Sequence, residues 1–251
     1  MKYSIIITYR DREKHLSQLL PVLQKKFQDK DYEIIISEQD DDKKFRKNDL
    51  YNIAVRDYAT GDVLIFHDVD CIPDENVTYE IKDQPVYPCR RAIFLDENGK
   101  PKDMESIPKG YQNFRNDVGE HSGFVFMLTK DMWKKIGGLN PLYRGWGLED
   151  DDTRERVRVY DYEWYRPEPE VGTFFILPHE DNHPGVEDKY YLRNVDEMGG
   201  KPKVELPIEK PFCDLHNTRW FGVFRYLKHY KQGDITTNKK SGYKIYSIDS
   251  G

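Results

Sequence analysis

The stretch DVLIFHDVD, residues Asp62–Asp70, reads as an apolar strand that ends in two aspartates one residue apart. Two other apolar runs precede it, KYSIIITYR at 2–10 and EIIIS at 33–37, and a helical pattern follows each of them. This alternation predicts an α/β fold with a mixed, mostly parallel sheet flanked by helices. Ligands of such sheets bind beyond the carboxyl ends of the strands, so we expect the aspartates to face a ligand.

The remaining pattern is less regular. Pro21 interrupts the first helical run and predicts a kink or an early end of that helix. Strand patterns recur at 87–95, 173–179 and 243–248, and helical patterns at 129–140 and 149–160; Thr129 is expected to cap the first of these helices and glycines to end it. From residue 180 to 242 the sequence is polar and irregular, and it does not indicate a separate domain.

Composition narrows the classes of function. Hydrophobic residues make up 37% and charged residues 33%, which is typical of a globular protein, and the net charge of −6 gives no reason to expect nucleic acid or an anionic membrane as partner. The sequence contains neither a signal peptide nor an apolar run of about 18 residues, so we expect a cytoplasmic protein without a membrane span. Three cysteines without CxxC spacing predict neither a disulfide framework nor a zinc cluster.

The two aspartates of HDVD are candidate metal ligands. Alternate residues of an extended segment share a face, so Asp68 and Asp70 can point into one site, and their oxygens suit Mg2+ or Mn2+ in contact with phosphates. A solvated turn is the alternative for two acids so spaced. His179 and His183 follow a later strand, and imidazole ligation would favour Mn2+. His67 is expected to pack against or orient this site.

Two further clusters contain side chains that could bind a ligand or take part in a reaction. Tyr9, Arg10 and Arg12 follow the first strand and could hold a nucleobase and its phosphates, or form a solvated helix start. GWGLEDDD, residues 145–152, places four acids behind a tryptophan between glycines. A helix start favours acids in its first turn, but that does not account for the tryptophan.

Four segments occur in the order found in beta-1,4-galactosyltransferases: YRDR at 9–12, EQDDDKKFRKNDLYN at 38–52, FHDVD at 66–70 and GWGLEDDD at 145–152. From Ser4 to His179 the chain therefore resembles this family. The family pattern FNRAxLxN is matched loosely by FRKNDLYN, in which Lys47 replaces the arginine, and Thr8 stands where the family usually has proline.

The resemblance implies a GT-A, Rossmann-like nucleotide-diphosphosugar transferase. Such an enzyme would be inverting and dependent on Mn2+, with Mg2+ as the alternative, and would move a hexose or N-acetylhexosamine from a UDP-sugar to a glycan or other hydroxyl acceptor in β linkage. One GT-A domain would then cover residues 1–251. It would comprise a nucleotide-binding half at 1–72, an acceptor and catalytic half at 73–180, and an irregular C-terminal extension at 181–251.

The same resemblance implies roles for individual residues. Asp150 would be the general base, with Glu149 beside it, and Trp146, Glu149 and Asp150 would contact the acceptor. Asp70 and His179 would bind the metal, with His183 as a substitute for the family's additional ligand, which is Ile176 here. The nucleotide-sugar would contact Tyr9, Arg10, Arg12, Phe45, Lys47, Asn52, Asp68 and Trp146.

Two questions stay open at this level. His121 and Ser122 lie where relatives choose between galactose and N-acetylgalactosamine, so the donor sugar is not determined. The competing functions are a binding protein of the same fold without turnover, and a hydrolase of nucleotide sugars. Asp151 and Asp152 are expected to have structural roles, paired with Arg154 or Arg156.

Overall fold

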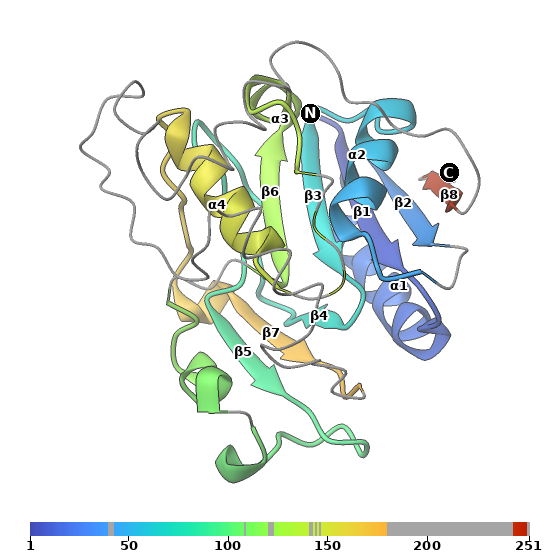
Figure 1. Cartoon of the computed structure of the whole chain (residues 1–251). Helices are drawn as coiled ribbons and strands as arrows, with labels where there is room; N and C mark the ends of the chain where they lie inside the picture. Colours follow the sequence, from blue (N-terminus) through green and yellow to red (C-terminus); the bar gives the residue numbers. More distant parts are fainter. Residues whose placement is uncertain are drawn as a thin grey trace.

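The computed structural model describes residues 1–39, 43–107, 109–119, 123–140, 143, 145, 147–179 and 243–249, the last segment and residues 109–110 by backbone alone. A five-stranded sheet in the order β6-β3-β1-β2-β8 runs through the molecule (Figure 1). Its strands are β1 (Tyr3–Tyr9), β2 (Tyr32–Gln39), β3 (Val63–Asp68), β6 (Val125–Thr129) and β8 (Tyr243–Asp249). The centre is parallel, whereas β6 and β8 pair antiparallel with β3 and β2. The expected mixed α/β sheet is confirmed.

The three central strands are apolar along nearly their whole length because both faces of the sheet are covered. The side chains of Ile5–Ile7, Ile34–Ile36 and Leu64–Phe66 are completely or almost completely buried. In the sheet register, Thr8 of β1 pairs with Ser37 of β2 and with Asp68 of β3. The carboxyl ends of these strands are therefore level, and polar side chains begin at the same edge.

In the described residues, four α-helices accompany the sheet: α1 (Glu13–Phe27), α2 (Lys47–Asp57), α3 (Lys130–Lys135) and α4 (Glu149–Val159). Pro21 was expected to kink α1 or to end it early; the early end was wrong, because α1 continues to Phe27. Pro21 lies on the exposed side of α1, and burial of Leu23 and Phe27 offsets the lost hydrogen bond. The prediction for α3 is confirmed, since the Thr129 hydroxyl accepts from the Met132 N–H and two glycines with positive φ follow the helix.

A second, three-stranded sheet has the order β4-β7-β5 and was not predicted as such. It consists of β4 (Cys71–Pro73), β7 (Thr173–Ile176) and β5 (Arg91–Phe94), and both β7 and β5 are shorter than the patterns at 173–179 and 87–95. Neither β4 nor β6 was expected from the sequence. Short 3-10 helices are η1 (Met104–Ser106), η2 (Lys109–Arg115) and η3 (Pro169–Val171).

The second sheet brings distant segments to the end of β3. β4 follows β3 after a two-residue turn and pairs antiparallel with β7, so that Cys71 faces Ile176. Just beyond this pair, the Leu177 N–H donates to the Asp70 carbonyl at 2.8 Å. The aspartates of HDVD and the segment that carries His179 therefore meet as neighbouring backbones.

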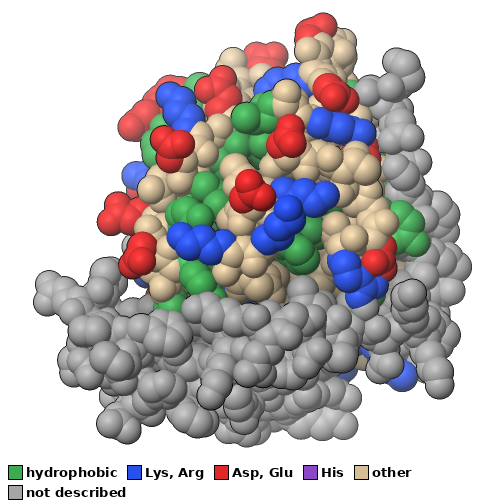
Figure 2. All heavy atoms as spheres, turned by 90° about the horizontal axis from the view of Figure 1, so that it is seen from above, with side chains coloured by type: hydrophobic (Ala, Val, Ile, Leu, Met, Phe, Trp, Pro, Cys, Tyr) green, Lys and Arg blue, Asp and Glu red, His purple; other side chains and the backbone are tan. Residues whose placement is uncertain are grey.

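The surface carries charges of both signs. Figure 2 shows the face at the amino ends of β1 and β3, where basic and acidic side chains are interspersed among apolar and polar ones. Within the described residues, no helix combines the length and the apolar character needed to cross a membrane. The division of residues 1–251 into halves and an extension stays a prediction, since most of 181–251 lies outside the described residues.

Candidate active site

A cleft of about 180 Å³ opens at the carboxyl end of β3. Its polar lining includes Lys47, both aspartates of HDVD, both leading acids of α4 and His179, and much of the remaining lining is apolar. These polar residues come from α2, β3, α4 and the segment after β7. The structure thus brings together side chains from four of the segments singled out in the sequence.

The carboxylate of Asp70 meets two cationic or basic partners. Its Oδ2 lies 3.3 Å from Nη1 of Arg12 and 3.4 Å from Nδ1 of His179. Neighbouring ligand atoms in an octahedral site with bonds of about 2.1 Å are about 3 Å apart. The spacing between the Asp70 oxygen and the His179 nitrogen therefore fits a shared divalent ion.

Other atoms near Asp70 are poorer ligands. Asp68, Asp70 and Cys71 can bring one ligand atom each within 4.8 Å of one another. Burial, followed by the effect of Asp70, raises the pKa of the Cys71 thiol well above its usual range, so the thiol stays protonated. Ile176 offers no ligand atom, and His183, the predicted substitute, lies outside the described residues. The described part of the site thus supports Asp70 and His179.

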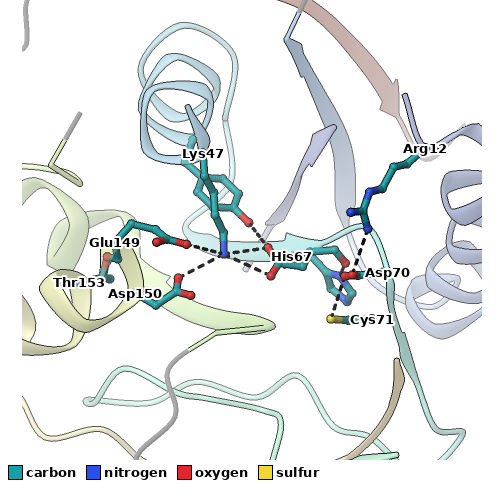
Figure 3. Close-up of polar contacts among 10 residues, drawn as sticks. Arg12, Lys47, His67, Asp70, Cys71, Glu149, Asp150 and Thr153 are labelled. Atoms are coloured by element: carbon teal, nitrogen blue, oxygen red, sulfur yellow. Dashed lines mark hydrogen bonds and ion pairs between the residues drawn. The ribbon is translucent and has the colours of Figure 1, made fainter. Parts of the chain in front are cut away.

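Lys47 connects the two acidic segments. Its Nζ lies 3.1 Å from Oδ1 of Asp68, 3.2 Å from Oδ1 of Asp150 and 3.9 Å from Oε1 of Glu149 (Figure 3). Burial opposes the charge of this ammonium, but Asp150 and Asp68 outweigh burial and raise the Lys47 pKa well above its usual value. A stable cation at the start of α2 therefore holds the end of β3 and the start of α4 together.

Tyr51 is a site residue that the sequence analysis missed. Its side chain is 1% exposed, and its hydroxyl donates to Oδ1 of Asp68 at 3.3 Å. Burial and the neighbouring Asp68 raise the Tyr51 pKa well above its usual range, so the phenol remains a donor. The i, i+4 spacing from Lys47 on one helix was the signal that could have found it.

His67 lies beneath the turn between the two aspartates. Its Nδ1 is 2.9 Å from the Asp68 carbonyl and must donate to it, so its Nε2 accepts from the Tyr79 hydroxyl at 3.1 Å. Burial lowers the His67 pKa to about 4, which keeps the ring neutral. The orienting position expected for His67 is confirmed.

The start of α4 presents two acids to the cleft. The chain enters the helix through Gly147 and Leu148, both with positive φ, and Leu148 directly precedes Glu149. Burial, followed by the effect of Asp150, raises the Glu149 pKa to about 8. Burial also raises the Asp68 pKa to about 6, against the opposing effect of Lys47. Glu149 is therefore protonated at neutral pH and can donate a hydrogen bond.

Replacing Glu149 with glutamine is expected to remove part of the pH dependence of stability. The folded pKa of about 8 exceeds the usual 4.5, so the free energy of unfolding falls as pH rises between these values. Glutamine stays neutral throughout. In thermal unfolding at pH 6 and pH 9, the variant should gain Tm relative to the parent chain at the higher pH. A Tm difference that is independent of pH would contradict the raised pKa.

The last two acids of the run, Asp151 and Asp152, form ion pairs with arginines and do not line the cleft. Asp151 lies 3.2 Å from Arg154, and Asp152 lies 3.0 Å from Arg156 in an ion pair whose side chains are both completely buried. The predicted structural pairing of these acids is confirmed. Only the first two acids, Glu149 and Asp150, line the cleft.

The residues predicted to bind a nucleotide lie around the end of β1. The Arg10 guanidinium stands 5.6 Å from the centre of the Phe45 ring and donates to the Lys43 carbonyl at 2.5 Å. Arg12 turns to Asp70, as described above, and Tyr9 is 6% exposed. Arg10, Arg12 and Phe45 therefore form a basic and aromatic group that continues from the acidic part of the cleft.

The expected contact of Asn52 with the nucleotide-sugar needs correction. Its side chain is 1% exposed, its amide donates to the Leu139 carbonyl at 2.6 Å, and its oxygen accepts from the Leu139 N–H at 2.9 Å. Both polar groups are thus used to attach α2 to the chain after α3. Trp146, together with His121 and Ser122, lies outside the described residues.

Comparison with known proteins bears on this arrangement. Residues 1–89 match the family described as the N-terminal region of glycosyl transferase group 7, and residues 110–180 match that described as the N-terminal domain of galactosyltransferase. The chain belongs to glycosyl transferase group 7. Beta-1,4-galactosyltransferase 4 of Cricetulus griseus is 32% identical over 205 residues, 78% of this chain and 52% of the relative. Human beta-1,4-galactosyltransferase 5 is 31% identical over 245 residues, 94% and 55% of the two chains.

The chain spans about half the length of these curated relatives. Among solved structures, Drosophila beta-1,4-galactosyltransferase 7 in complex with manganese, UDP-Gal and xylobiose has a TM-score of 0.60 at 21% identity, over 83% of each chain. A mannosyltransferase of Pyrobaculum calidifontis in complex with GDP-Man and Mn2+ has a TM-score of 0.51 at 11% identity, over 95% of this chain and 76% of the other. The family member described here has the GT-A fold, as the resemblance implied.

Proposed function

We propose that the chain is an inverting glycosyltransferase that moves a hexose or N-acetylhexosamine from a UDP-sugar to a hydroxyl of a glycan or other acceptor. The observation that carries the proposal is the Lys47 ammonium, which lies 3.1 Å from Asp68 and 3.2 Å from Asp150. The acids beside the candidate metal ligands and the acids of α4 therefore face one another across a single cleft. Membership of the family and the named activities of its relatives support the same reaction.

On this proposal, the donor lies along the end of β1 and β3. Arg10 and Arg12 supply guanidinium groups for its phosphates, and Phe45 supplies an aromatic face for its base. Asp70 and His179 would hold a divalent ion, Mn2+ or Mg2+, whose charge stabilises the diphosphate as it leaves. Lys47 and Asp68 contact the sugar between the diphosphate and α4.

The acceptor lies against α4. Asp150 accepts the proton of the acceptor hydroxyl while that oxygen forms a bond to the anomeric carbon, and the bond from this carbon to the diphosphate oxygen breaks. UDP leaves with the electron pair, and attack from the opposite side inverts the anomeric configuration. Glu149, protonated at neutral pH, donates a hydrogen bond to acceptor or donor sugar. Trp146 on the preceding loop would cover the sugars, and His183 would complete the metal ligands.

The test is a panel of nucleotide sugars with Mn2+, assayed for UDP release with and without mixed saccharide acceptors. Transfer predicts release that depends on an acceptor and a glycosylated product detectable by mass spectrometry. Release that is equally fast without any acceptor would assign the chain to nucleotide-sugar hydrolysis. Binding of UDP-sugar without any release would assign it to a binding protein of the same fold.

A further inference from the structure

Several aromatic rings that contact one another lie at the cleft, in addition to the carboxylates. Phe94 and Tyr111 are 6.0 Å apart between ring centres, Tyr111 and Phe114 5.1 Å, and Phe114 and Phe124 6.0 Å. Phe94, Tyr111 and Phe124 are half-buried and line the cleft together with the buried Ile107. We call Phe94, Ile107, Tyr111 and Phe124 the aromatic wall. Half-exposed rings in a cleft offer a surface on which the apolar face of a sugar or an aglycone can stack.

The backbone of the aromatic wall is fixed to the catalytic edge. Phe124 has a φ of 79°, which costs a bulky side chain about 1–3 kcal/mol. In this conformation its carbonyl accepts from the Asp68 N–H at 2.9 Å, while its ring lines the cleft. Phe124 thus fixes the distance between the aromatic wall and Asp68.

Lys102 lies at the far end of the aromatic wall. It follows a hairpin in which Leu95 pairs with Pro101, and its N–H donates to the Phe94 carbonyl at 2.8 Å. The Lys102 carbonyl accepts from the Arg115 guanidinium, so one backbone hydrogen bond and one side-chain hydrogen bond fix the backbone at this position. The side chain lines the same cleft as Asp150. Lys102 is therefore a positioned residue of the cleft.

Among the described residues, Lys102 has no ion-pair partner, unlike the other basic groups that line the cleft. Lys47 contacts three carboxylates and His179 contacts Asp70. Within the described part of the chain, no carboxylate lies within ion-pair distance of Lys102. Backbone hydrogen bonds link Asp70 to Leu177, Ile176 to Leu95 and Phe94 to Lys102, so about three strand spacings, or roughly 14 Å, separate Asp70 from Lys102. The backbone of Lys102 is therefore remote from that of the candidate metal ligand Asp70.

We propose that the aromatic wall and Lys102 form an acceptor subsite for a glycoside that bears an anionic group, a carboxylate or a phosphate. The inference rests on the proposed function and adds the acceptor class. The carboxylates of Asp68, Asp70 and Asp150 repel an anion, and Lys102, whose backbone lies about three strand spacings from Asp70, attracts it. The acceptor is thereby oriented with its anionic group toward the hairpin and a hydroxyl toward Asp150, while its apolar face stacks on the aromatic wall.

Matched ligands test the proposal. 4-Nitrophenyl β-glucoside, the corresponding β-glucuronide and the β-glucoside 6-phosphate differ only in the group at C6. Their dissociation constants are measured by NMR titration of the full chain with Mn2+ and UDP. One or both anionic ligands should bind about tenfold more tightly than the neutral one, and which of them does so distinguishes carboxylate from phosphate.

Two variants complete the test. Lys102→Met should abolish the advantage of the anionic ligand and leave the affinity of the neutral one almost unchanged. Lys100→Met removes the same charge from an exposed position of the same hairpin and should preserve the advantage. An unchanged Tm and unchanged UDP binding in both variants would show that the fold and donor site are intact.

The proposal is overturned by equal affinity for neutral and anionic ligands, by an advantage that survives Lys102→Met, or by no binding of any of the three while UDP still binds. Failure of the proposed function has a different signature, because UDP and Mn2+ would then not bind or no nucleotide sugar would be turned over. Transfer to neutral acceptors alone, without discrimination, contradicts the acceptor class and leaves the glycosyltransferase intact.

Discussion

Asp150→Asn is expected to lower kcat and kcat/KM together by about 10²- to 10⁴-fold while Mn2+ and donor affinities stay nearly unchanged. Asparagine keeps the size of the side chain and an oxygen that can accept from Lys47, whose Nζ lies 3.2 Å from Asp150. It cannot take the proton of an acceptor hydroxyl. Steady-state kinetics with the best donor and acceptor of the panel, together with calorimetry of donor binding, measure the two effects separately.

Asp151→Asn is the matched control for this experiment. Asp151 is the next residue of the same helix, carries the same charge and pairs with Arg154 at 3.2 Å outside the cleft. This variant should retain most of the activity. If Asp151→Asn were inactive and Asp150→Asn active, the base would be the wrong residue of the run. Normal turnover by both variants would mean that these acids do not take part in the chemistry.

Asp70→Ala is expected to weaken metal-dependent UDP binding by about 100-fold or more, since even partners of metal ligands contribute 10- to 100-fold. The same carboxylate oxygen faces His179 and Arg12, so its removal affects the metal and the diphosphate together. His179→Ala should weaken Mn2+ binding as well, but leaves the ion pair with Arg12 in place. Isothermal calorimetry with UDP, with and without Mn2+, measures both effects.

Asp83→Ala serves as the control, because Asp83 is an exposed acid away from the cleft and its loss changes the net charge equally. It should bind UDP and Mn2+ as the parent chain does. Unchanged Mn2+-dependent binding in Asp70→Ala or in His179→Ala would exclude that residue from the metal site. A loss of binding that is independent of Mn2+ would indicate a phosphate contact in place of a metal contact.

The sequence predicted those strands and helices that can be recognised from the periodicity of neighbouring residues alone. The apolar runs of β1, β2 and β3 are buried on both faces, and the acidic run begins α4 at Glu149, as the periodicity indicated. β4 was missed because three residues are too few to show a period, and β6 because its antiparallel pairing with β3 depends on a distant segment. At Pro21, tertiary burial of Leu23 and Phe27 outweighed a local signal.

Most of the charged residues of the candidate site were named from the sequence, but their mutual contacts were not predicted. The ion pair between Lys47 and Asp150 joins positions 103 residues apart, and no spacing rule links them. Asn52 matches the family pattern, yet its amide is used entirely by Leu139. The aromatic wall and Lys102 were not predicted. They lie in or next to a turn-rich segment, where the sequence pattern does not distinguish an aromatic residue or a lysine of a binding site from one of the core or the surface.

The backbone hydrogen bond from Leu177 to the Asp70 carbonyl bears on how such a chain can diversify. Because it fixes strand register, an insertion of one residue in β4 or β7 would shift Asp70 relative to the segment that carries His179. The hairpin between Leu95 and Pro101 ends in an exposed turn, where residues can be exchanged or added without altering any register. On the proposed function, evolution of a protein built in this way can change the acceptor far more readily than it can change the ion and the donor.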